Sequence, residues 1–281
     1  MVERLRSHNF DALDVAQAVA TLPMPETPSF LIRMRPRFDI HMYEQVASTN
    51  QTLWDMTDAQ AGTVAIAHTQ TAGKGQRGKQ WLSTPGGLYL SVMLEPDWPA
   101  DRSAQLTLTT VWGIVSQFRQ LGIPAQIKWP NDIVVTDQKL GGILSETKLE
   151  QGVITQAVIG VGINVYNPVP VTGIAWQQLT TTHQNTLCDV AAAVLLGIWR
   201  GIFYRNSIDS PTFIDAYQSL LTHLNKPVVL EGKTWKVVGV TESGYLTLES
   251  TSEDLALTNG PVAQLIHVKS GELSLGYAQS G

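Results

Sequence analysis

At 281 residues, with 43% hydrophobic and 15% charged side chains, the chain has the composition of a globular protein with room for one large domain and a small one. Its net charge of −5 argues against nucleic acid as the main partner, because binding a phosphate backbone requires an excess of local cations. The single cysteine, Cys188, excludes an intramolecular disulfide framework and a multi-cysteine metal site, and it favours a reducing cytoplasm.

Residues 1–38 are predicted to form an N-terminal extension. A short helix over residues 11–22 is followed by four prolines, which interrupt regular structure. No stretch reaches ~18 consecutive apolar residues, so we expect no membrane span. A cationic segment followed by an apolar one is also missing from the N-terminus, so we expect no secretory signal.

Residues 39–224 are predicted to form the main domain, of the α+β class, with helices packed on a mixed β-sheet. A strand over residues 41–46 precedes a helix-capping signal at 48–50, and a strand over 63–68 leads into a glycine-rich loop. The other predicted strands cover residues 88–94, 125–128, 132–136, 142–148 and 154–161, and the other helices residues 105–121, 186–205 and 211–223.

Residues 225–281 change in character. Short β-type runs at 227–230, 234–240 and 245–249 are separated by glycine and acidic turns. This spacing predicts a small all-β barrel behind the main domain.

The loop that follows residue 70 is the first segment that indicates chemistry. It interleaves glycines with cations and ends on an aromatic residue: Gly73, Lys74, Gly75, Gln76, Arg77, Gly78, Lys79 and Trp81. Glycines let backbone N–H groups approach an anion, and the cations complement its charge. The loop lacks the ending of a Walker A motif, and its glycine spacing alone is weak evidence for a dinucleotide turn. The alternative is an exposed hairpin with solvated charges. We expect a loop that is mobile when empty and closes over an anion.

A second segment lies about fifty residues further on. Lys128 ends a strand, Pro130 fixes a turn, and Asn131 and Asp132 follow, with Lys139 shortly after. Such a turn directs polar groups from a strand end, although a plain β-turn and an exposed hairpin lysine are the simpler alternatives.

Glycines also alternate with β-branched residues in a later strand, at Gly160 and Gly162, as they would where a flat ligand lies against the strand. Another strand crossing closely is the alternative. For Ser48, Thr49 and Asn50 the sequence alone favours a helix cap over a ligand site, although a hydroxyl that does not cap can still face a pocket. Trp176 fits either a core position or a stacking platform for a purine.

The histidines show no metal-ligand spacing and are interpreted as structural or solvated. Cys188 lies among apolar residues of a predicted helix, so a buried inert thiol is expected.

Taken together, the segments at 48–50, 73–81, 128–132, 139–142, 160–164 and 271–275 resemble those of biotin–protein ligases in order and spacing. The resemblance covers most of the chain, residues 40–276. It implies a class II synthetase-like sheet with a small SH3-like barrel. The family's bifunctional members carry an N-terminal DNA-binding module; this chain resembles the ligase-only type, so no DNA partner is expected.

The resemblance implies a two-step reaction. Biotin and Mg-ATP give biotinyl-5′-adenylate and pyrophosphate, and a lysine of a biotin carboxyl carrier protein then takes the biotinyl group. It further implies a cytoplasmic enzyme without a membrane partner, either a monomer or a homodimer.

The family's site residues are carried over by motif. Catalytic roles fall to Lys139, Lys74 and Lys128, with Lys139 stabilising charge at the α-phosphorus. Biotin contacts are expected from Ser48, Thr49, Asn50, Gln70, Gly73, Lys74, Gly75, Gln76, Trp81, Tyr89, Lys139, Gly142, Gly160 and Gly162. Nucleotide contacts are expected from Arg77, Lys79, Asn131, Asp132, Asn164 and Trp176, and Asp132 is the expected Mg²⁺ ligand.

The chain departs from the family pattern in its cations. Gln76 stands where an arginine is usual, and Lys74 and Lys79 keep charge without the bidentate fork of arginine. Gly276 also replaces an arginine that ends the last motif in many members.

Two other functions are compatible with parts of the pattern. A lipoate ligase or octanoyltransferase shares the broad fold, but the octanoyltransferases use a cysteine nucleophile and Cys188 lies far from every motif. A binding protein that holds biotin or an adenylate without turnover is supported only by Gln76.

Overall fold

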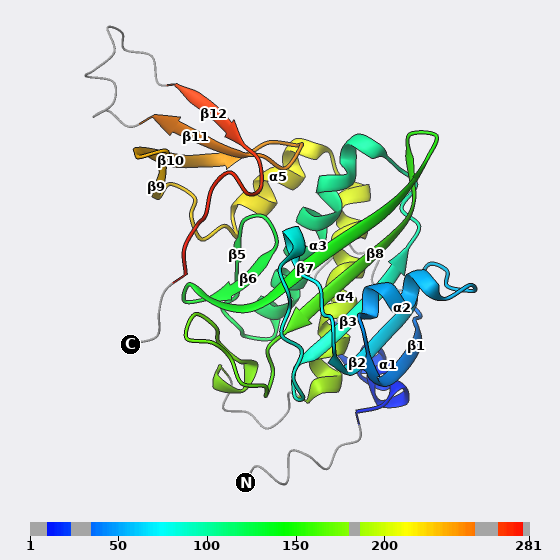
Figure 1. The fold of residues 1–281 in the computed structure, drawn as a ribbon. Coiled ribbons are helices and arrows are strands. Elements are labelled where there is room, and N and C mark those ends of the chain that lie inside the picture. Colours follow the sequence, from blue (N-terminus) through cyan, green and yellow to red (C-terminus); the bar gives the residue numbers. More distant parts are fainter. Residues whose placement is uncertain (1–9, 24–34, 180–185, 251–263, 278–281) are drawn as a thin grey trace, which may run out of the picture.

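Two β-sheets and the helices packed on them make up the part of the chain that the computed structural model describes, residues 10–23, 35–179, 186–250 and 264–277 (Figure 1). The helices are α1 (Ala12–Thr21), α2 (Thr49–Asp55), α3 (Ser103–Gln120), α4 (Leu187–Ser207) and α5 (Ser210–Gln218), with short 3-10 turns η2 (Gln76–Gly78), η3 (Ala100–Arg102) and η4 (Trp176–Gln178). The strands are β1 (Asp39–Val46), β2 (Thr63–Gln70), β3 (Leu88–Leu94), β4 (Trp98–Pro99), β5 (Gln126–Lys128), β6 (Asp132–Val135), β7 (Gln138–Glu150), β8 (Val153–Ile163), β9 (Pro227–Leu230), β10 (Lys233–Val240), β11 (Leu246–Ser250) and β12 (Leu265–Val268).

The large sheet is mixed, as the sequence predicts. Its strands run in the order β1-β2-β3-β8-β7-β6-β5, and β4 pairs with β8 at the side. Only β1 and β2 are parallel; the other pairings are antiparallel. The long hairpin of β7 and β8 places Gly142 directly opposite Gly162 and Glu146 opposite Val158. The strands therefore bring the segments 139–142 and 160–164 to the same place.

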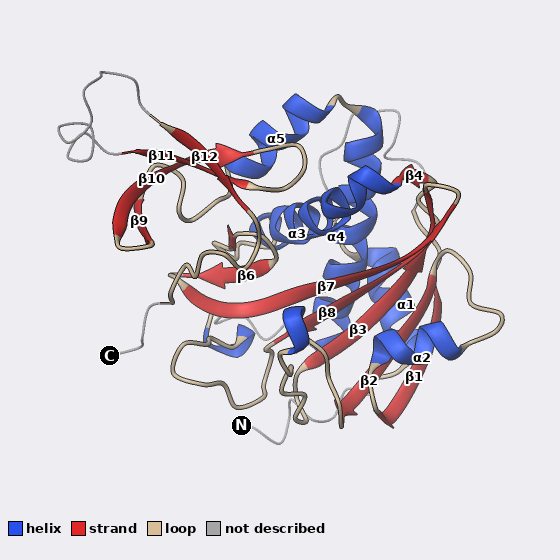
Figure 2. Ribbon diagram, turned by 45° about the horizontal axis from the view of Figure 1, so that its top comes forward, coloured by secondary structure: helices blue, strands red, loops and turns tan. Residues whose placement is uncertain are grey.

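The two faces of this sheet have different partners. Alternate strand residues such as Val64, Ile66 and Leu90 belong to the main core with α3 and α4. The intervening residues Ala65 and Met93 pack with Leu53 of α2 on the opposite face. Figure 2 shows α3 and α4 on one side of the sheet and α2 on the other. The α2 face is the one that leaves room for a site.

Helices α3 and α4 cross closely because glycines meet at the crossing. A Cβ at Gly113 would collide with the backbone of Gly197 and Gly201, so only glycine permits this approach. Among the described residues, α4 alone is long and apolar enough to cross a membrane, with a mean hydropathy of 1.6, but 61% of that segment is buried in the protein. Packing in the core accounts for its apolar character.

The predicted small β unit is confirmed as an antiparallel sheet of four strands in the order β12-β11-β10-β9. It contacts the main domain through polar groups: Gln218 Oε1 accepts from Val240 N at 2.7 Å, and Trp129 Nε1 donates to Gly244 O at 2.9 Å. Residues 251–263, between β11 and β12, lie outside the described residues.

Three expectations about elements need correction. The helix predicted over 211–223 ends at Gln218, because residues 220–222 instead exchange backbone hydrogen bonds with Ile127 of β5, at 2.8 and 2.9 Å. The helix in the predicted N-terminal extension does not stand apart from the main domain: Val15 of α1 is fully buried in the main core. Strand β12 was not predicted.

Candidate active site

Two adjoining cavities lie where the glycine loop faces β7 and β8. The inner cavity is smaller than the outer one. Of the predicted residues, the inner cavity brings together Ser48, Thr49, Asn50, Gln70, Lys74, Gly75, Gln76, Trp81, Asn131, Lys139, Gly142, Gly160 and Gly162. The outer cavity adds Arg77, Lys79, Lys128 and Asp132, together with residues of the C-terminal segment 270–277.

Five residues line both cavities: Gly75, Gln76, Trp81, Asn131 and Lys139. They mark the junction between the two spaces. A ligand in the inner cavity and one in the outer cavity would therefore meet beside the Lys139 ammonium group.

The polar end of the inner cavity begins at the start of α2. Ser48 occupies the N-cap position, but its hydroxyl makes no capping hydrogen bond. The hydroxyl of this buried residue is therefore not committed to the helix, and Ser48 lines the cavity. The cap position predicted from the sequence is confirmed, whereas the capping bond is not formed.

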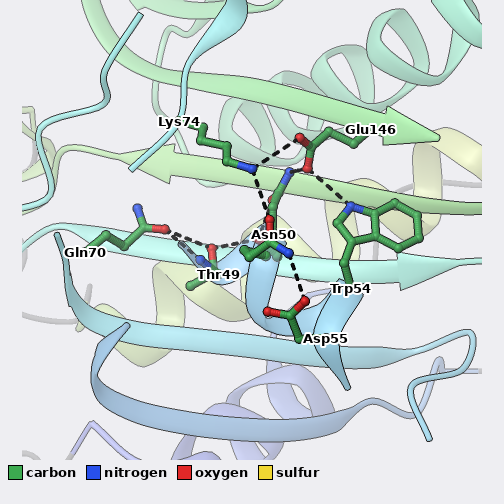
Figure 3. A network of polar contacts seen from close by, with 9 residues as sticks. Thr49, Asn50, Trp54, Asp55, Gln70, Lys74 and Glu146 are labelled. Atoms are coloured by element: carbon green, nitrogen blue, oxygen red, sulfur yellow. Dashed lines mark hydrogen bonds and ion pairs between the residues drawn. The ribbon is translucent and has the colours of Figure 1, made fainter. Parts of the chain in front are cut away.

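Gln70 is held by groups on both sides of its amide. Its Oε1 accepts from Thr49 N at 2.8 Å and lies 3.2 Å from the Thr49 hydroxyl, and its Nε2 donates to Ser83 Oγ at 2.8 Å. Figure 3 shows Gln70 and Thr49 side by side in this network. These bonds fix the orientation of the amide at the cavity wall.

The glycines of β8 receive side chains of the protein itself. A Cβ at Gly162 would collide with the indole of Trp81, and one at Gly160 would collide with the amide of Asn50. The flat group that lies against Gly162 is thus Trp81. Among the described residues, Trp81 Nε1 is a buried donor that has no hydrogen-bond partner.

Lys139 is placed by a β-bulge. The register of β6 and β7 shifts between Ile133 and Val134, and Lys139 Nζ forms an ion pair with Asp132 Oδ1 at 2.7 Å. Their side chains are 29% and 16% exposed, respectively. The Lys139 backbone is also held: Asn164 Nδ2 donates to its carbonyl at 3.1 Å, and its N–H donates to Thr172 O at 2.9 Å.

Lys128 and Tyr277 form the wall of the outer cavity. The Lys128 ammonium lies 2.9 Å from the centroid of the Tyr277 ring, and the Tyr277 hydroxyl donates to Asp132 Oδ2. Burial lowers the pKa of Lys128 to about 8; the charges of Lys139 and Lys79 act in the same direction, and Asp132 opposes them. Burial and the Asp132 carboxylate raise the pKa of Tyr277, which keeps it a neutral donor.

Asn131 supports the turn before β6. Its Nδ2 donates to Ile143 O at 2.7 Å, and Ile143 N donates to Asn131 O at 3.1 Å. The Trp129–Pro130 peptide bond in this turn is cis. The turn and the site role that the sequence left open are thus compatible, because Asn131 also lines both cavities.

The glycine loop folds back as a hairpin. Gly75 N donates to Lys79 O at 2.6 Å, and Trp81 N donates to Gly73 O at 2.9 Å. Two cations tie the loop to other segments: Lys74 lies 3.8 Å from Glu146, and Arg77 donates to Ser270 Oγ at 2.6 Å. Arg77 takes a positive φ of 58° in the 3-10 turn. Gly73 lines neither cavity but a third hollow, beside the loop.

Besides Gly73, three predicted contact residues lie outside both cavities. Tyr89 is buried, its hydroxyl donates to Thr84 O at 2.6 Å, and burial raises its pKa to about 12. Trp176 is 1% exposed and packs edge-on against Phe118, 4.8 Å between ring centroids, so it is a core residue here and not a stacking platform. Asn164 holds the Lys139 backbone instead of facing a ligand.

Two residues at the site were missed from the sequence. Glu146 continues the alternation of Gly142 and Leu144 on one face of β7, and this period-2 spacing could have identified it. Tyr277 gave no signal, because it lies in an irregular segment after the last strand.

The comparisons with known proteins agree with this geometry. An α+β domain with paired cavities on one sheet face defines a small-molecule-binding domain, and residues 42–164 match the profile of the biotin/lipoate A/B protein ligase family. The bifunctional ligase/repressor BirA of Escherichia coli is 32% identical over 221 residues, which cover 73% of this chain and 67% of that protein. The chain belongs to the biotin/lipoate A/B protein ligase family.

Other similarities extend the comparison. The bifunctional ligase/repressor BirA of Bacillus subtilis is 37% identical over 127 residues, 44% of this chain, and the match spans only 39% of its own length. The structure of the biotin protein ligase from Aquifex aeolicus in complex with biotin and ATP superposes with a TM-score of 0.68 at 27% identity, over 85% of this chain and 99% of that one.

Proposed function

We propose that this protein is a biotin–protein ligase, which forms biotinyl-5′-adenylate from biotin and ATP and transfers the biotinyl group to a lysine of a biotin carboxyl carrier protein. The family membership and the fold shared with a biotin protein ligase that binds biotin and ATP support this proposal. The observation that carries it is the position of Lys139, at the junction of the two cavities.

Charge explains why a lysine is needed at that junction. A biotin carboxylate and the α-phosphate of ATP are both anions, and two unit charges ~4 Å apart repel by roughly 4 kcal/mol at an effective dielectric constant of ~20. The Lys139 ammonium offsets this repulsion. It also stabilises the negative charge that builds up on the phosphoryl oxygens in the transition state.

The first step exchanges one P–O bond for another. A carboxylate oxygen of biotin attacks the α-phosphorus while the bond to the pyrophosphate oxygen breaks, so pyrophosphate leaves from the outer cavity. In the second step the neutral amine of the acceptor lysine attacks the acyl carbon, AMP leaves, and the amine proton passes to solvent. Juxtaposition and electrostatics supply the rate gain, because no covalent enzyme intermediate is required.

The inner cavity matches the chemistry of biotin. The uncommitted Ser48 hydroxyl and the oriented Thr49 and Gln70 groups offer donors and acceptors to a neutral ureido ring. Trp81, lying over bare glycine backbone, offers an apolar wall, and its unpartnered Nε1 is a donor that a ligand oxygen would satisfy.

The outer cavity matches a polyphosphate with its Mg²⁺ ion. Lys128, Lys79 and Arg77 line it and complement phosphate charge. Among the described residues no cluster of three metal-ligating side chains occurs, and Asp132 is a single carboxylate beside these cations. One carboxylate plus phosphate oxygens is the donor set that Mg²⁺ commonly uses, so Asp132 would hold the ion that offsets charge on the phosphates.

Two further properties belong to the same proposal. The enzyme acts in the cytoplasm, as the single buried cysteine and the acceptor class suggest. Cysteine chemistry of the octanoyltransferase type is disfavoured, because Cys188 lies in α4 within the core and burial raises its pKa to about 11.

Pyrophosphate release tests the proposal. The purified protein is mixed with ATP and Mg²⁺, with and without biotin, and with lipoate in place of biotin. We expect release that requires biotin and is not supported by lipoate. Tight biotin binding in a calorimetric titration without any release would favour the binding protein that the sequence left open.

A further inference from the structure

Glu146 joins three segments of the site at one carboxylate. Its Oε2 accepts from Asn50 Nδ2 at 2.8 Å and from Trp54 Nε1 at 3.3 Å, and its Oε1 lies 3.8 Å from Lys74 Nζ. Figure 3 shows Glu146 of β7 reaching toward Asn50 and Trp54 of α2 and toward Lys74 of the glycine loop. No sequence motif assigned a role to this residue.

The carboxylate fixes which way the Asn50 amide faces. An ionised carboxylate only accepts hydrogen bonds, so the amide must turn Nδ2 toward Glu146. Oδ1 then faces Ser91 Oγ at 2.6 Å. Asn50 is 3% exposed and packs on Gly160, where a Cβ would collide with the amide oxygen. Both ends of the Asn50 amide are therefore hydrogen-bonded within the protein, and Asn50 is not a direct ligand of biotin.

This orientation determines which of the neighbouring hydroxyls donates and which accepts in each contact. The Ser91 hydroxyl has one proton, and Asn50 Oδ1 can only accept, so Ser91 donates its proton to Asn50 Oδ1. Ser91 Oγ also lies 2.7 Å from Thr49 Oγ1, so Thr49 donates to Ser91 across this short contact and not to Gln70 Oε1, which is 3.2 Å away and already accepts from Thr49 N. Thr49 Oγ1 then accepts no hydrogen bond within this network, so its lone pairs are left as acceptors at the cavity, which Thr49 lines.

The same carboxylate restrains the glycine loop. Lys74 of the loop approaches Glu146, and its Nζ also donates to Gln51 Oε1 at 3.3 Å. The Lys74 side chain is 44% exposed, so solvent screens the ion pair. The pair favours the closed loop without locking it.

We infer that Glu146 is a positioning residue for biotin. It makes Thr49 an acceptor for a ureido N–H by orienting Asn50, and it favours closure of the glycine loop through Lys74. This inference deepens the proposed function and rests on it.

An exchange of donor and acceptor tests the inference. Biotin affinity is measured by calorimetry for wild type, Glu146→Gln, Asn50→Asp and the double variant, with Glu150→Gln at the exposed end of the same strand as the matched control. Asn50→Asp places two carboxylates together and should weaken binding about tenfold or more, since charged hydrogen bonds carry that much affinity. The double variant restores an amide–carboxylate pair and should recover most of the loss.

The melting temperature of each variant separates positioning from folding. We expect the double variant to regain biotin affinity. Glu146→Gln alone should lower the hydrogen-exchange protection of residues 73–80 with biotin bound. Glu150→Gln should match wild type in biotin affinity and in hydrogen-exchange protection. A double variant that binds no better than Asn50→Asp overturns the inference, as does an affinity loss that follows the melting temperature across all variants. A wild-type protein that binds no biotin overturns the proposed function itself, and the inference with it.

Discussion

At the residue scale, the polar side chains around the inner cavity fall into two groups. Asn50 and Gln70 have their amides held by neighbouring protein groups, so they shape the wall. The Ser48 hydroxyl makes no capping hydrogen bond, and the Trp81 indole N–H has no hydrogen-bond partner among the described residues. The second group is where a ligand gains most, because a buried unpaired donor is costly until it is satisfied.

Lys128 makes nucleotide binding dependent on pH. Its pKa is lowered to about 8 by burial, so the ammonium is lost as the pH rises through that value, well below the pKa of an exposed lysine. We expect ATP affinity to be constant below this point and to fall above it. Calorimetric titration with ATP over this range measures the effect.

Lys128→Arg is the control, because the guanidinium stays charged at every pH of the experiment. Its ATP affinity should not fall over the same range. A wild-type affinity that is unchanged well above pH 8 would contradict a role for the Lys128 charge.

Gln76 lines both cavities, at the position where the resemblance stated from the sequence leads us to expect an arginine. Gln76→Arg adds a cation beside the site of adenylate formation, and a charged hydrogen bond to phosphate should slow escape of the adenylate about tenfold. The rate is measured by chasing preformed labelled adenylate with unlabelled biotin and ATP. An unchanged rate would show that Gln76 does not limit retention.

At the scale of elements, the strands of the large sheet were predictable and the contacts between loops were not. Periodicity identifies β7 and β8, and their pairing brings Gly142 and Gly162 together. The bulge that shifts the register of β6 against β7 near Lys139 leaves no mark in the sequence. Residues 219–223 continue the helical pattern of α5, yet pairing with β5 prevails there.

Burial explains why two of the predicted contact residues lie outside the cavities. Trp176 and Tyr89 belong to segments that resemble the family pattern, but both side chains pack inward. Aromatic side chains fit a core and a ligand wall equally well by composition, so the sequence alone does not separate these positions. Glu146 could have been found from the alternation along β7, whereas Tyr277 depends on a tertiary contact.

The C-terminal segment reaches into the outer cavity through Tyr277. Its hydroxyl bonds to one oxygen of Asp132 while Lys139 holds the other, so Mg²⁺ competes with Tyr277 for that carboxylate. Tyr277→Phe removes this competition and should tighten binding of ATP with Mg²⁺ about threefold to tenfold, the range expected for a hydrogen bond to a charged group. Calorimetry compares Tyr277→Phe with Tyr245→Phe, a matched change in the turn before β11. Weaker ATP binding by Tyr277→Phe would mean that the hydroxyl serves the nucleotide.

At the scale of the whole molecule, the glycine loop connects the main domain to the C-terminal unit. Lys74 ties it to Glu146 and Arg77 ties it to Ser270, which lies 193 residues further along the chain. A Cβ at Gly271 would collide with the Arg77 guanidinium, so the two segments are in close contact. Closure of the loop and the position of the C-terminal segment should therefore change together.

Hydrogen exchange tests this coupling. We expect residues 73–80 to gain protection when biotin and ATP bind, and residues 270–277 to gain it at the same time, because Arg77 transmits the change. Arg77→Ala should leave the gain in the loop and reduce it in the C-terminal segment. Protection that rises in the loop alone in wild type would contradict the coupling.

The central claim is that the Lys139 ammonium lies where the biotin carboxylate meets the α-phosphorus. Single-turnover pyrophosphate release is its most direct test, comparing wild type with Lys139→Ala and, as a control on the same strand, the exposed Lys148→Ala. The account predicts a fall of about a hundredfold to a thousandfold in the rate for Lys139→Ala, as for the loss of other transition-state donors, with an unchanged melting temperature and an unchanged rate for Lys148→Ala. A Lys139→Ala protein that releases pyrophosphate at the wild-type rate would contradict it.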